Sequence, residues 1–394
     1  MNNPATMNEL SHATPPAGSN NGTSRLTAAV GGGIPAPKGF AVWDAENAAE
    51  HAAWTRLWNS SPAGDIFAHP SYVRLFRQPG DRALCAAWES SQGKVLFPFL
   101  LRDLSAEPYW DADLGPACDL ISPYGFGGAA FWGSPDPAAL SGDFWKSFDA
   151  WASAHRIVSE FVRFSPFEED LLPYPGVVCE NRKMIVRDLR PPQHVIWREF
   201  AHNIHYNIRR AQRAGVQVQI DVQGDSLPEF LRIYEHTMRR RDADPMFLFP
   251  PRFFAQLQRD LCGRFVYFHA ICAGRVLASE LVLLSADAAY SYLGGTDSEA
   301  FRLGPNHLLK FEIMRWATAQ GKQWFVLGGG HEPNDGIYQY KRGFAPTGVV
   351  SFRVGYKIRD EQSCNQLIEA RRRHGQRAGQ DWLPQPNFFP PYRA

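Results

Sequence analysis

A segment near residue 330 carries residue types that could hold and activate a ligand. A hydrophobic strand pattern ends at three glycines (328–330), and Tyr338, Tyr340 and Lys341 follow within a few residues. Glycines let backbone amides come close to a bound group, while the tyrosines and the lysine add shape and positive charge. The segment suits a ligand-holding loop, and a strand–loop–helix joint that uses glycines for tight packing is the alternative.

Two carboxylates are candidates for proton transfer. Asp335 and Glu280 could each accept the proton that an attacking ammonium group must lose. Asp335 stands before a glycine, so an ordinary turn residue is the alternative interpretation. Glu280 interrupts the apolar run from residue 276 to 284, where an unpaired carboxylate would be costly. It either lines a ligand site as a general base or lies on the solvated face of a strand.

Three residues before the alternating run at 216–222 are candidates for substrate binding. Asn207, Arg209 and Arg210 lie together in sequence, and an arginine fork suits the phosphate groups of a nucleotide- or lipid-linked acceptor. A solvated helix face is the alternative. His331 follows the three glycines, but no partner spacing points to a metal, so we expect it to form hydrogen bonds. The sequence predicts no metal site and no tightly bound cofactor.

The composition limits the class of protein. The chain has 394 residues, of which 44% are hydrophobic and 13% aromatic, enough for a globular protein of about two domains. With 41 basic and 40 acidic residues, the formal charge of +1 argues against bulk electrostatic coating of nucleic acid, so we expect no DNA partner. The 6 cysteines are scattered without a CxxC pair, which fits a reducing cytoplasm.

The two ends of the chain differ from its middle. Residues 1–38 are rich in Asn, Ala, Pro, Gly, Ser and Thr, and we predict a disordered leader there. Residues 361–394 combine a basic helical end with an aromatic tail, which we expect to dock on the body of the protein. No apolar run approaches the roughly 18 residues of a membrane helix, so contact with a membrane would be peripheral.

The second half of the chain gives the clearest order of elements. Strict alternation at 216–222 predicts a strand, and Ser226–Glu229 predicts a capping box at the start of a helix with one apolar stripe. Short connections between three apolar runs predict an antiparallel meander. The predicted elements are a strand at 216–222, helices from 226 and 251, strands at 265–273, 276–285 and 289–296, a helix from 304, a strand at 323–327, a short helix, and a strand at 349–358.

A weaker copy of this order precedes it. The elements of the copy are a strand at 40–44, helices at 48–58 and 71–76, strands at 84–89 and 95–102, a helix at 144–154, and a strand at 159–164. No residue-level repeat accompanies the duplication, which rests on element order. We predict an α/β (α+β) fold of two similar domains, residues 39–190 and 191–360, each a mixed, mostly antiparallel sheet flanked by helices.

Several segments resemble the ordered signatures of FemABX-type transferases. These segments are Asn207–Val216, Tyr292–Asp297, Gly304–Leu309, Leu327–Gly330 and Gly336–Phe344. The resemblance covers about residues 40–358 and is strongest in the second half. It implies two tandem domains of the GNAT acyltransferase fold, with the second as the catalytic domain. It also implies substrate contacts within these segments, by Tyr292, Gly304, Asn306, Gly329, Gly330, Tyr338 and Tyr340.

The resemblance also implies a reaction. Members of the family transfer an acyl or aminoacyl group to an amine, and peptidoglycan-bridge enzymes use aminoacyl-tRNA as donor. Lys341 follows an aromatic residue where the family motif carries a functionally important lysine, and a fixed ammonium can stabilise the oxyanion of an attacked carbonyl. We expect a cytoplasmic acyltransferase that forms an amide on a small-molecule, sugar or cell-envelope precursor.

Two departures from the family patterns leave the donor open between acyl-CoA and aminoacyl-tRNA. GNAT enzymes hold the pyrophosphate of acyl-CoA with the backbone amides of an R/Q-x-x-G-x-G/A loop at a helix N-terminus. The matching stretch here is Phe301–Asn306, in which Pro305 removes one amide donor. The chain also lacks the long heptad-patterned hairpin of some bridge-forming members, so a tRNA would need another docking surface. A catalytically inactive binding or scaffold protein is the alternative from another class.

Overall fold

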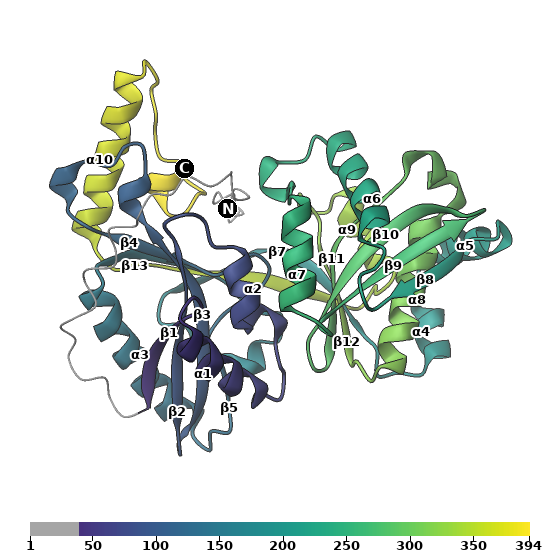
Figure 1. The fold of residues 1–394 in the computed structure, drawn as a ribbon, viewed down its shortest axis with the longest axis horizontal. Coiled ribbons are helices and arrows are strands. Elements are labelled where there is room, and N and C mark those ends of the chain that lie inside the picture. Colours follow the sequence, from purple (N-terminus) through teal and green to yellow (C-terminus); the bar gives the residue numbers. More distant parts are fainter. Residues whose placement is uncertain (1–38) are drawn as a thin grey trace, which may run out of the picture. The chain divides into compact units, whose positions relative to one another are not determined.

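The computed structural model describes residues 39–394, and the leader predicted for residues 1–38 lies outside them. The described chain divides into two compact units, whose elements Figure 1 labels. Unit 1 contains residues 39–62, 67–181 and 352–394, and unit 2 contains residues 63–66 and 182–351. The sequence predicts domain limits near residues 190 and 360, whereas the chain passes between the units at 181–182 and 351–352.

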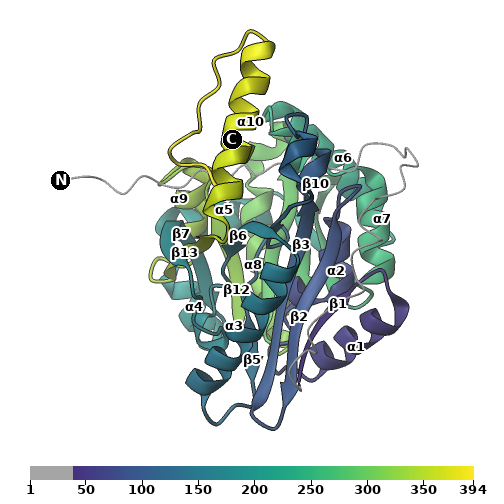
Figure 2. The same ribbon diagram turned by 90° about the vertical axis from the view of Figure 1, so that its left-hand side faces the viewer.

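Unit 1 is a sheet with helices on both faces (Figure 2). Leu84 and Trp88 of strand β2 lie in one hydrophobic cluster with Phe144 and Phe148 of helix α3. Because side chains alternate along a strand, Cys85 and Ala87 point to the other face, where α2 contacts β2. The elements are β1 (Phe40–Asp44), α1 (Ala48–Asn59), α2 (Pro70–Leu75), β2 (Arg82–Ser90), β3 (Gly93–Asp103), β4 (Cys118–Ile121), β5 (Ala130–Trp132), α3 (Pro137–Ala154), β6 (Ile157–Arg163) and α10 (Glu361–Arg377).

Unit 2 has the same layered construction. Tyr267 packs edge-on against Phe230 of α6, while its neighbour Phe268 packs edge-on against Trp316 of α8, so these two helices cover opposite faces of the sheet. The elements are α4 (Gln193–Glu199), α5 (His202–Arg213), β8 (Gln217–Asp221), α6 (Leu227–Arg240), α7 (Pro251–Asp260), β9 (Phe265–Cys272), β10 (Arg275–Leu284), β11 (Ala288–Thr296), α8 (Pro305–Ala319), β12 (Trp324–Gly329) and α9 (Gly336–Arg342).

The two units repeat one strand order. Neighbouring strands run β1-β2-β3-β4-β6 in unit 1 and β8-β9-β10-β11-β12 in unit 2. In both series the first three pairs are antiparallel and the last pair is parallel. The predicted tandem fold is confirmed, and the predicted meander at 265–296 is β9–β11. The sequence interpretation missed β4, β5 and the strand β7 (Val177–Asp188).

The closing strand of each unit comes from the other half of the sequence. Strand β7 (Val177–Asp188) follows β6 in the chain, yet its residues 184–188 pair with β12 in unit 2. Strand β13 (Val349–Ile358) follows α9, yet its residues 354–358 pair with β6 in unit 1. The two halves of the chain have therefore exchanged their last strands.

The capping box predicted at Ser226 is wrong. Helix α6 does begin at Leu227, but the Ser226 side chain makes no hydrogen bond to the helix. Its hydroxyl instead donates to Asp221 and lies 2.7 Å from Nε2 of His269. These two stronger partners, one of them charged, take the hydroxyl away from the helix amides.

The C-terminal segment docks on unit 1, as expected from its aromatic residues. Tyr392 is fully buried in a cluster with Cys364 and Leu367 of α10. Its hydroxyl lies 2.7 Å from the hydroxyl of Ser159 on β6. No helix among residues 39–394 is long and apolar enough to cross a membrane.

Candidate active site

Asp335 holds the glycine loop against helix α9. It caps the helix and accepts hydrogen bonds from the backbone amides of Tyr338 (2.7 Å), His331 (2.7 Å) and Glu332 (3.1 Å). Burial alone would raise the pKa of this carboxyl, but the amide donors outweigh burial and lower the pKa. A side chain at Gly330 would meet Asp335 Oδ1 at 2.1 Å. Because the carboxylate is engaged by the backbone, the geometry favours the turn interpretation of Asp335 over proton transfer.

Lys341 of α9 lies against the same loop. Its Nζ donates a hydrogen bond to the carbonyl oxygen of Gly329 at 2.6 Å. Burial, followed by the positive charge of Lys310, lowers the pKa of Lys341 to about 8, against the opposing charges of Glu280 and Asp335. An amine with a pKa near the working pH can both carry a charge and exchange a proton.

Glu280 and Lys310 form a buried ion pair in the same unit. Glu280 of β10 is 4% exposed and Lys310 of α8 is 5% exposed. Lys310 Nζ donates to Glu280 Oε1 and to the hydroxyl of Ser291 on β11, both at 2.5 Å. The solvated-face alternative for Glu280 is therefore wrong, because its carboxylate lies inside unit 2 and is balanced by a cation.

Sequence reasoning missed Lys310. It belongs to the buried face of α8 together with Leu309 and Ile313. A lysine on the buried stripe of a helix is the signal that could have found it, since its charge needs a partner. Its partner Glu280 is 30 residues away in the chain, so the pair is visible only once the helix is placed on the sheet.

Tyr340 joins α9 to the start of α8. Its hydroxyl donates to the carbonyl oxygen of Asn306 at 3.1 Å, and its ring meets the ring of His307 edge-on with centroids 5.0 Å apart. Burial, followed by the charge of Glu280, raises the pKa of Tyr340, so the hydroxyl stays protonated and remains a donor. Tyr340 and Asn306, both predicted substrate contacts, thus also fix the helix pair.

Asn207 and Arg210 meet the start of α8 at Gly304. Gly304 has a left-handed φ of 70°, and a Cβ there would lie 3.1 Å from the carbonyl oxygen of Asn207 and 3.6 Å from Arg210 Nη2. The side-chain nitrogen of Asn207 lies 3.3 Å from Nε2 of His307. Burial, followed by the charge of Arg210, lowers the pKa of His307 to about 4. Pro305 is the first residue of α8, as the predicted loss of an amide donor requires.

The other two predicted substrate contacts, Tyr338 and Tyr292, lie where the protein packs against itself. Tyr338 is 5% exposed and belongs to the hydrophobic core of unit 2. Tyr292 lies half-buried on β11, close in sequence to Gly295. A Cβ at Gly295 would meet the hydroxyl of Thr237 at 2.2 Å, so this glycine lets α6 pack against the sheet.

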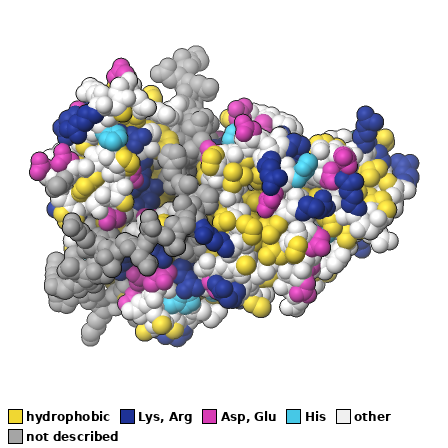
Figure 3. Space-filling model, turned by 45° about the horizontal axis from the view of Figure 1, so that its top comes forward, with side chains coloured by type: hydrophobic (Ala, Val, Ile, Leu, Met, Phe, Trp, Pro, Cys, Tyr) yellow, Lys and Arg dark blue, Asp and Glu magenta, His cyan; other side chains and the backbone are white. Residues whose placement is uncertain are grey.

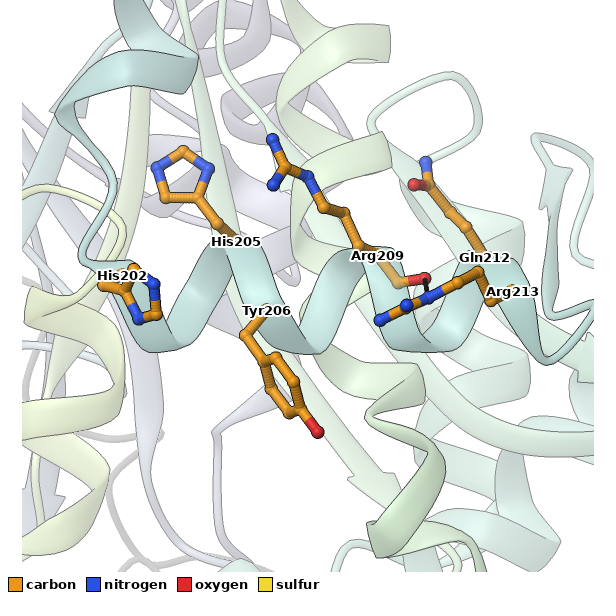
Figure 4. Close-up of a pocket in the computed structure, with 6 residues that line it drawn as sticks. All are labelled: His202, His205, Tyr206, Arg209, Gln212 and Arg213. Atoms are coloured by element: carbon orange, nitrogen blue, oxygen red, sulfur yellow. Dashed lines mark hydrogen bonds between the residues drawn. The ribbon is translucent and has the colours of Figure 1, made fainter.

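Arg209 belongs to a different stripe of α5 from Asn207 and Arg210. It lines an open pocket of about 720 Å³ on unit 2 (Figure 4). All the lining residues come from α5, and they are His202, His205, Tyr206, Arg209, Gln212 and Arg213. The structure therefore brings together Asn207 and Arg210 but separates Arg209 from them. In the described chain no group of three or more His, Cys, Asp or Glu side chains could hold a metal ion.

Residues 198–342 match a protein-family model described as Acetyltransferase (GNAT) domain. This span runs from the end of α4 to the end of α9 and contains every candidate residue described above. Among curated proteins, none matches the chain.

Solved structures share the fold over most of the chain. FemX aligns with a TM-score of 0.58 at 15% identity, covering 81% of this chain and 98% of FemX. A protein of unknown function from Bacteroides thetaiotaomicron aligns with a TM-score of 0.50 at 11% identity, covering 78% and 97%. At these identities the likeness concerns the fold.

Proposed function

We propose that this chain, whose residues 198–342 match the GNAT acetyltransferase domain model and whose fold is similar to that of FemX, transfers an acyl or aminoacyl group to the amine of a small-molecule, sugar or cell-envelope precursor. The donor carbonyl is activated as the thioester of acyl-CoA or the ester of aminoacyl-tRNA, and the product is an amide. The observation that carries the proposal is the position of Lys341, a half-buried amine between the glycine loop and the Glu280–Lys310 pair.

Lys341 can stabilise the negative charge that develops in this reaction and can also transfer its protons. A bond forms between the acceptor nitrogen and the donor carbonyl carbon, and the carbon–sulfur or carbon–oxygen bond to the leaving group breaks. The Lys341 ammonium stabilises the oxyanion of the tetrahedral intermediate. The leaving group needs one proton and the acceptor nitrogen loses one, so an amine with a pKa of about 8 can supply the first and take up the second.

Glu280 and Lys310 set the electrostatic surroundings of Lys341 in this scheme. The Glu280 carboxylate is held by Lys310 and Ser291 within a buried network, so we assign it no proton transfer from the acceptor. Besides burial, the positive charge of Lys310 lowers the pKa of Lys341. The negative charge of Glu280 raises this pKa and offsets part of the repulsion between the two lysines. Asp335 has the separate task of shaping the loop that Lys341 contacts.

The start of α8 keeps both donor classes in the proposal. Gly304 and Pro305 replace the amide-rich turn that holds a pyrophosphate in GNAT enzymes, and Arg210 supplies a cation beside Gly304 instead. We place the substrate contacts at this end of unit 2, around Asn207, Asn306 and the glycine loop. All six cysteines are free thiols, which supports a reducing, cytoplasmic location.

The test is product formation by the full chain with each donor class. Acetyl-CoA and a mixture of charged tRNAs are offered separately with a panel of amino sugars and small amines, and amide products are identified by mass spectrometry. We expect an amide from one donor class and a loss of about 100-fold or more in Lys341→Met. Arg342→Gln, which changes the exposed neighbour on the same helix, should keep the wild-type rate.

Two results would argue against this mechanism. A fully active Lys341→Met variant would remove Lys341 from the chemistry. A folded wild-type chain that retains a donor in native mass spectrometry but forms no amide with any acceptor would favour the inactive binding or scaffold protein.

A further inference from the structure

The outward stripe of α5 carries cationic and aromatic side chains without any acid. Helix α5 spans His202–Arg213 and contains no Asp or Glu. The six residues that line its pocket recur at intervals of three and four positions, so they share one stripe of the helix. Figure 4 shows all six on this single helix. The pocket of about 720 Å³ is of the size that small ligands occupy.

The two arginines of this stripe are available to an external anion. Arg213 Nε donates to the backbone carbonyl oxygen of Arg209 at 3.3 Å, and the Arg209 guanidinium lies 5.8 Å from the ring centre of Trp197. Within residues 39–394 neither arginine has a carboxylate partner. By contrast, two exposed arginines on other helices of unit 2 are paired: Arg239 with Glu235 at 3.0 Å and Arg315 with Glu312 at 2.9 Å.

The arginines of this stripe stand beside histidines on a helix without any acidic residue. On the face that Figure 3 shows, basic and acidic side chains are interspersed, in keeping with the net charge of +1. The stripe of α5 instead combines arginines and histidines on a helix without a carboxylate. Guanidinium groups match phosphate oxygens in geometry as well as in charge.

An aromatic ring completes the stripe. Tyr206 is 53% exposed, and the guanidinium of Arg210 lies 5.5 Å from its ring centre. Exposed tyrosines next to cations are surfaces on which nucleobases stack. Burial, followed by the charges of Arg209 and His202, lowers the pKa of His205 against a backbone hydrogen bond with Phe200, so its imidazole is neutral at pH 7, and its buried Nδ1 has no hydrogen-bond partner.

We propose that this stripe binds the adenosine phosphate portion of the acyl donor. Arg209 and Arg213 hold phosphate oxygens, Tyr206 stacks on the adenine, and His205 and Gln212 complete the hydrogen bonds. Coenzyme A and the 3′ end of a tRNA both carry an adenosine next to phosphate, so the same contacts can hold either, although the reactive ester of an aminoacyl-tRNA is on this adenosine and the thioester of acyl-CoA is at the end of the pantetheine arm. The inference rests on the proposed function, and it supplies a phosphate contact that the proline-interrupted start of α8 only partly provides.

The helix itself connects this pocket to the candidate active site. Asn207 and Arg210 reach from α5 to Gly304 at the start of α8, and the backbone amide of Ala201, just before α5, donates to the carbonyl oxygen of Gly343 at 2.8 Å. Gly343 directly follows α9, which carries Lys341. A donor bound to the outer stripe would therefore lie on helix α5, which contacts the start of α8 and, through Ala201, the end of α9.

Equilibrium binding without turnover tests the inference. Coenzyme A and a short single-stranded RNA ending in CCA are titrated separately into the full chain by calorimetry, at low and at physiological salt. We expect Arg209→Gln/Arg213→Gln to weaken binding by about tenfold or more, which one lost charge-assisted contact already predicts. Tyr206→Ala should also weaken it. The matched control Arg239→Gln/Arg259→Gln, which removes two exposed arginines from α6 and α7, should bind like wild type.

Each outcome has a defined meaning. Binding of coenzyme A alone, or of the RNA alone, supports the site and names the donor class. Equal affinities for the α5 variant and the control, or no binding of either ligand to wild type, would overturn the inference. If wild type forms amide while the α5 variant binds donor normally, only this inference falls. If donor binding depends on α5 and no amide forms, the proposed function falls and the site stands.

Discussion

Each unit buries a cluster of charged side chains around its third and fourth strands, but the charges of the two clusters are differently balanced. In unit 1, Asp119 of β4 accepts hydrogen bonds from Arg102 of β3 at 2.7 Å and from Arg393 at 2.6 Å, and Arg393 also pairs with Glu107. Each cation here has a carboxylate partner, and in this sense the cluster is balanced; the charges of both arginines also act on the nearby carboxyl of Asp81, whose pKa burial raises to about 6. Burial would raise the pKa of Asp119, but the two arginines outweigh burial and lower it.

The cluster of unit 2 contains one cation more than carboxylates. Lys310 bridges Glu280 of β10 and Ser291 of β11, and Lys341 lies close enough for both charges to shift its pKa. The hydrogen-bond acceptor of Lys341 is a backbone carbonyl. Removing one partner of the balanced cluster would leave a buried charge unpaired, whereas burial and the excess cation of unit 2 give Lys341 a pKa of about 8, as the proposed transfer requires.

The largest expected effect is on the balanced cluster. Asp119→Asn leaves Arg102 and Arg393 buried without their shared anion, so we expect the free energy of unfolding to fall by about 3–5 kcal/mol. Urea denaturation measures this. The control Glu107→Gln removes a partly exposed partner of Arg393 and should cost about 1 kcal/mol or less. Equal losses in the two variants would contradict the central position of Asp119.

Lys341→Met should give the opposite pattern. Transfer falls by about 100- to 1,000-fold, because one stabiliser of the oxyanion is lost. The free energy of unfolding stays the same or rises, because the substitution removes a partly desolvated cation. Initial rates and urea denaturation on the same samples check both parts. If Lys341→Met unfolds as easily as Asp119→Asn, the contrast between the two clusters does not hold.

The lowered pKa of Lys341 should make the free energy of unfolding depend on pH. Its pKa is about 8 in the folded protein and about 10.4 in an unfolded chain, so between these values the unfolded state binds more protons. The stability of wild type relative to Lys341→Met should therefore rise as the pH increases from about 8 to 10, and stay at its low level below 8. Urea denaturation at pH 7.5, 9 and 10 measures it.

The variant Lys310→Met tests the cause of the lowered pKa of Lys341. Lys310→Met removes the charge that lowers the pKa of Lys341, so the midpoint of the pH effect should move upward. An unchanged midpoint would show that Lys310 does not act on Lys341.

The smallest expected effect concerns the glycine loop. In Gly330→Ala the new methyl group would lie 2.1 Å from Asp335 Oδ1, so the loop must shift, at a cost of about 1 kcal/mol of unfolding stability together with slower transfer. Gly336→Ala places a methyl in open space at the start of α9 and should be neutral or stabilise by up to about 1 kcal/mol. Rates and thermal unfolding of the pair test this. Slower transfer in Gly336→Ala alone would contradict the role of Asp335.

The element order could be predicted because local patterns determine it. Apolar–polar alternation and helix-start patterns predicted the bounds of the elements from β8 to β13 to within a residue or two, because each pattern lies within the segment that it describes. The candidate site could be predicted only in part. Lys341 and Glu280 were found from motif and from a broken apolar run, but Lys310 joins them through a contact across 30 residues, which no local pattern reports.

The remaining differences have the same physical origin. Ser226 follows the pattern of a helix cap, yet its hydroxyl is bound by Asp221 and by His269, which is 43 residues away. The strand exchange also leaves no local trace, because β7 and β13 have the same strand pattern whichever sheet they join.

The strand exchange has a consequence for how the protein is made on the ribosome. Domains usually fold in the order of their synthesis, the N-terminal one first. Here the sheet of unit 1 begins at Phe40, but β13 can pair with β6 only after residue 358 has been synthesised. The partner of Asp119, Arg393, is synthesised later still. Unit 2 is nearly continuous from residue 182 to 351. The half of the protein that is translated first is therefore completed last.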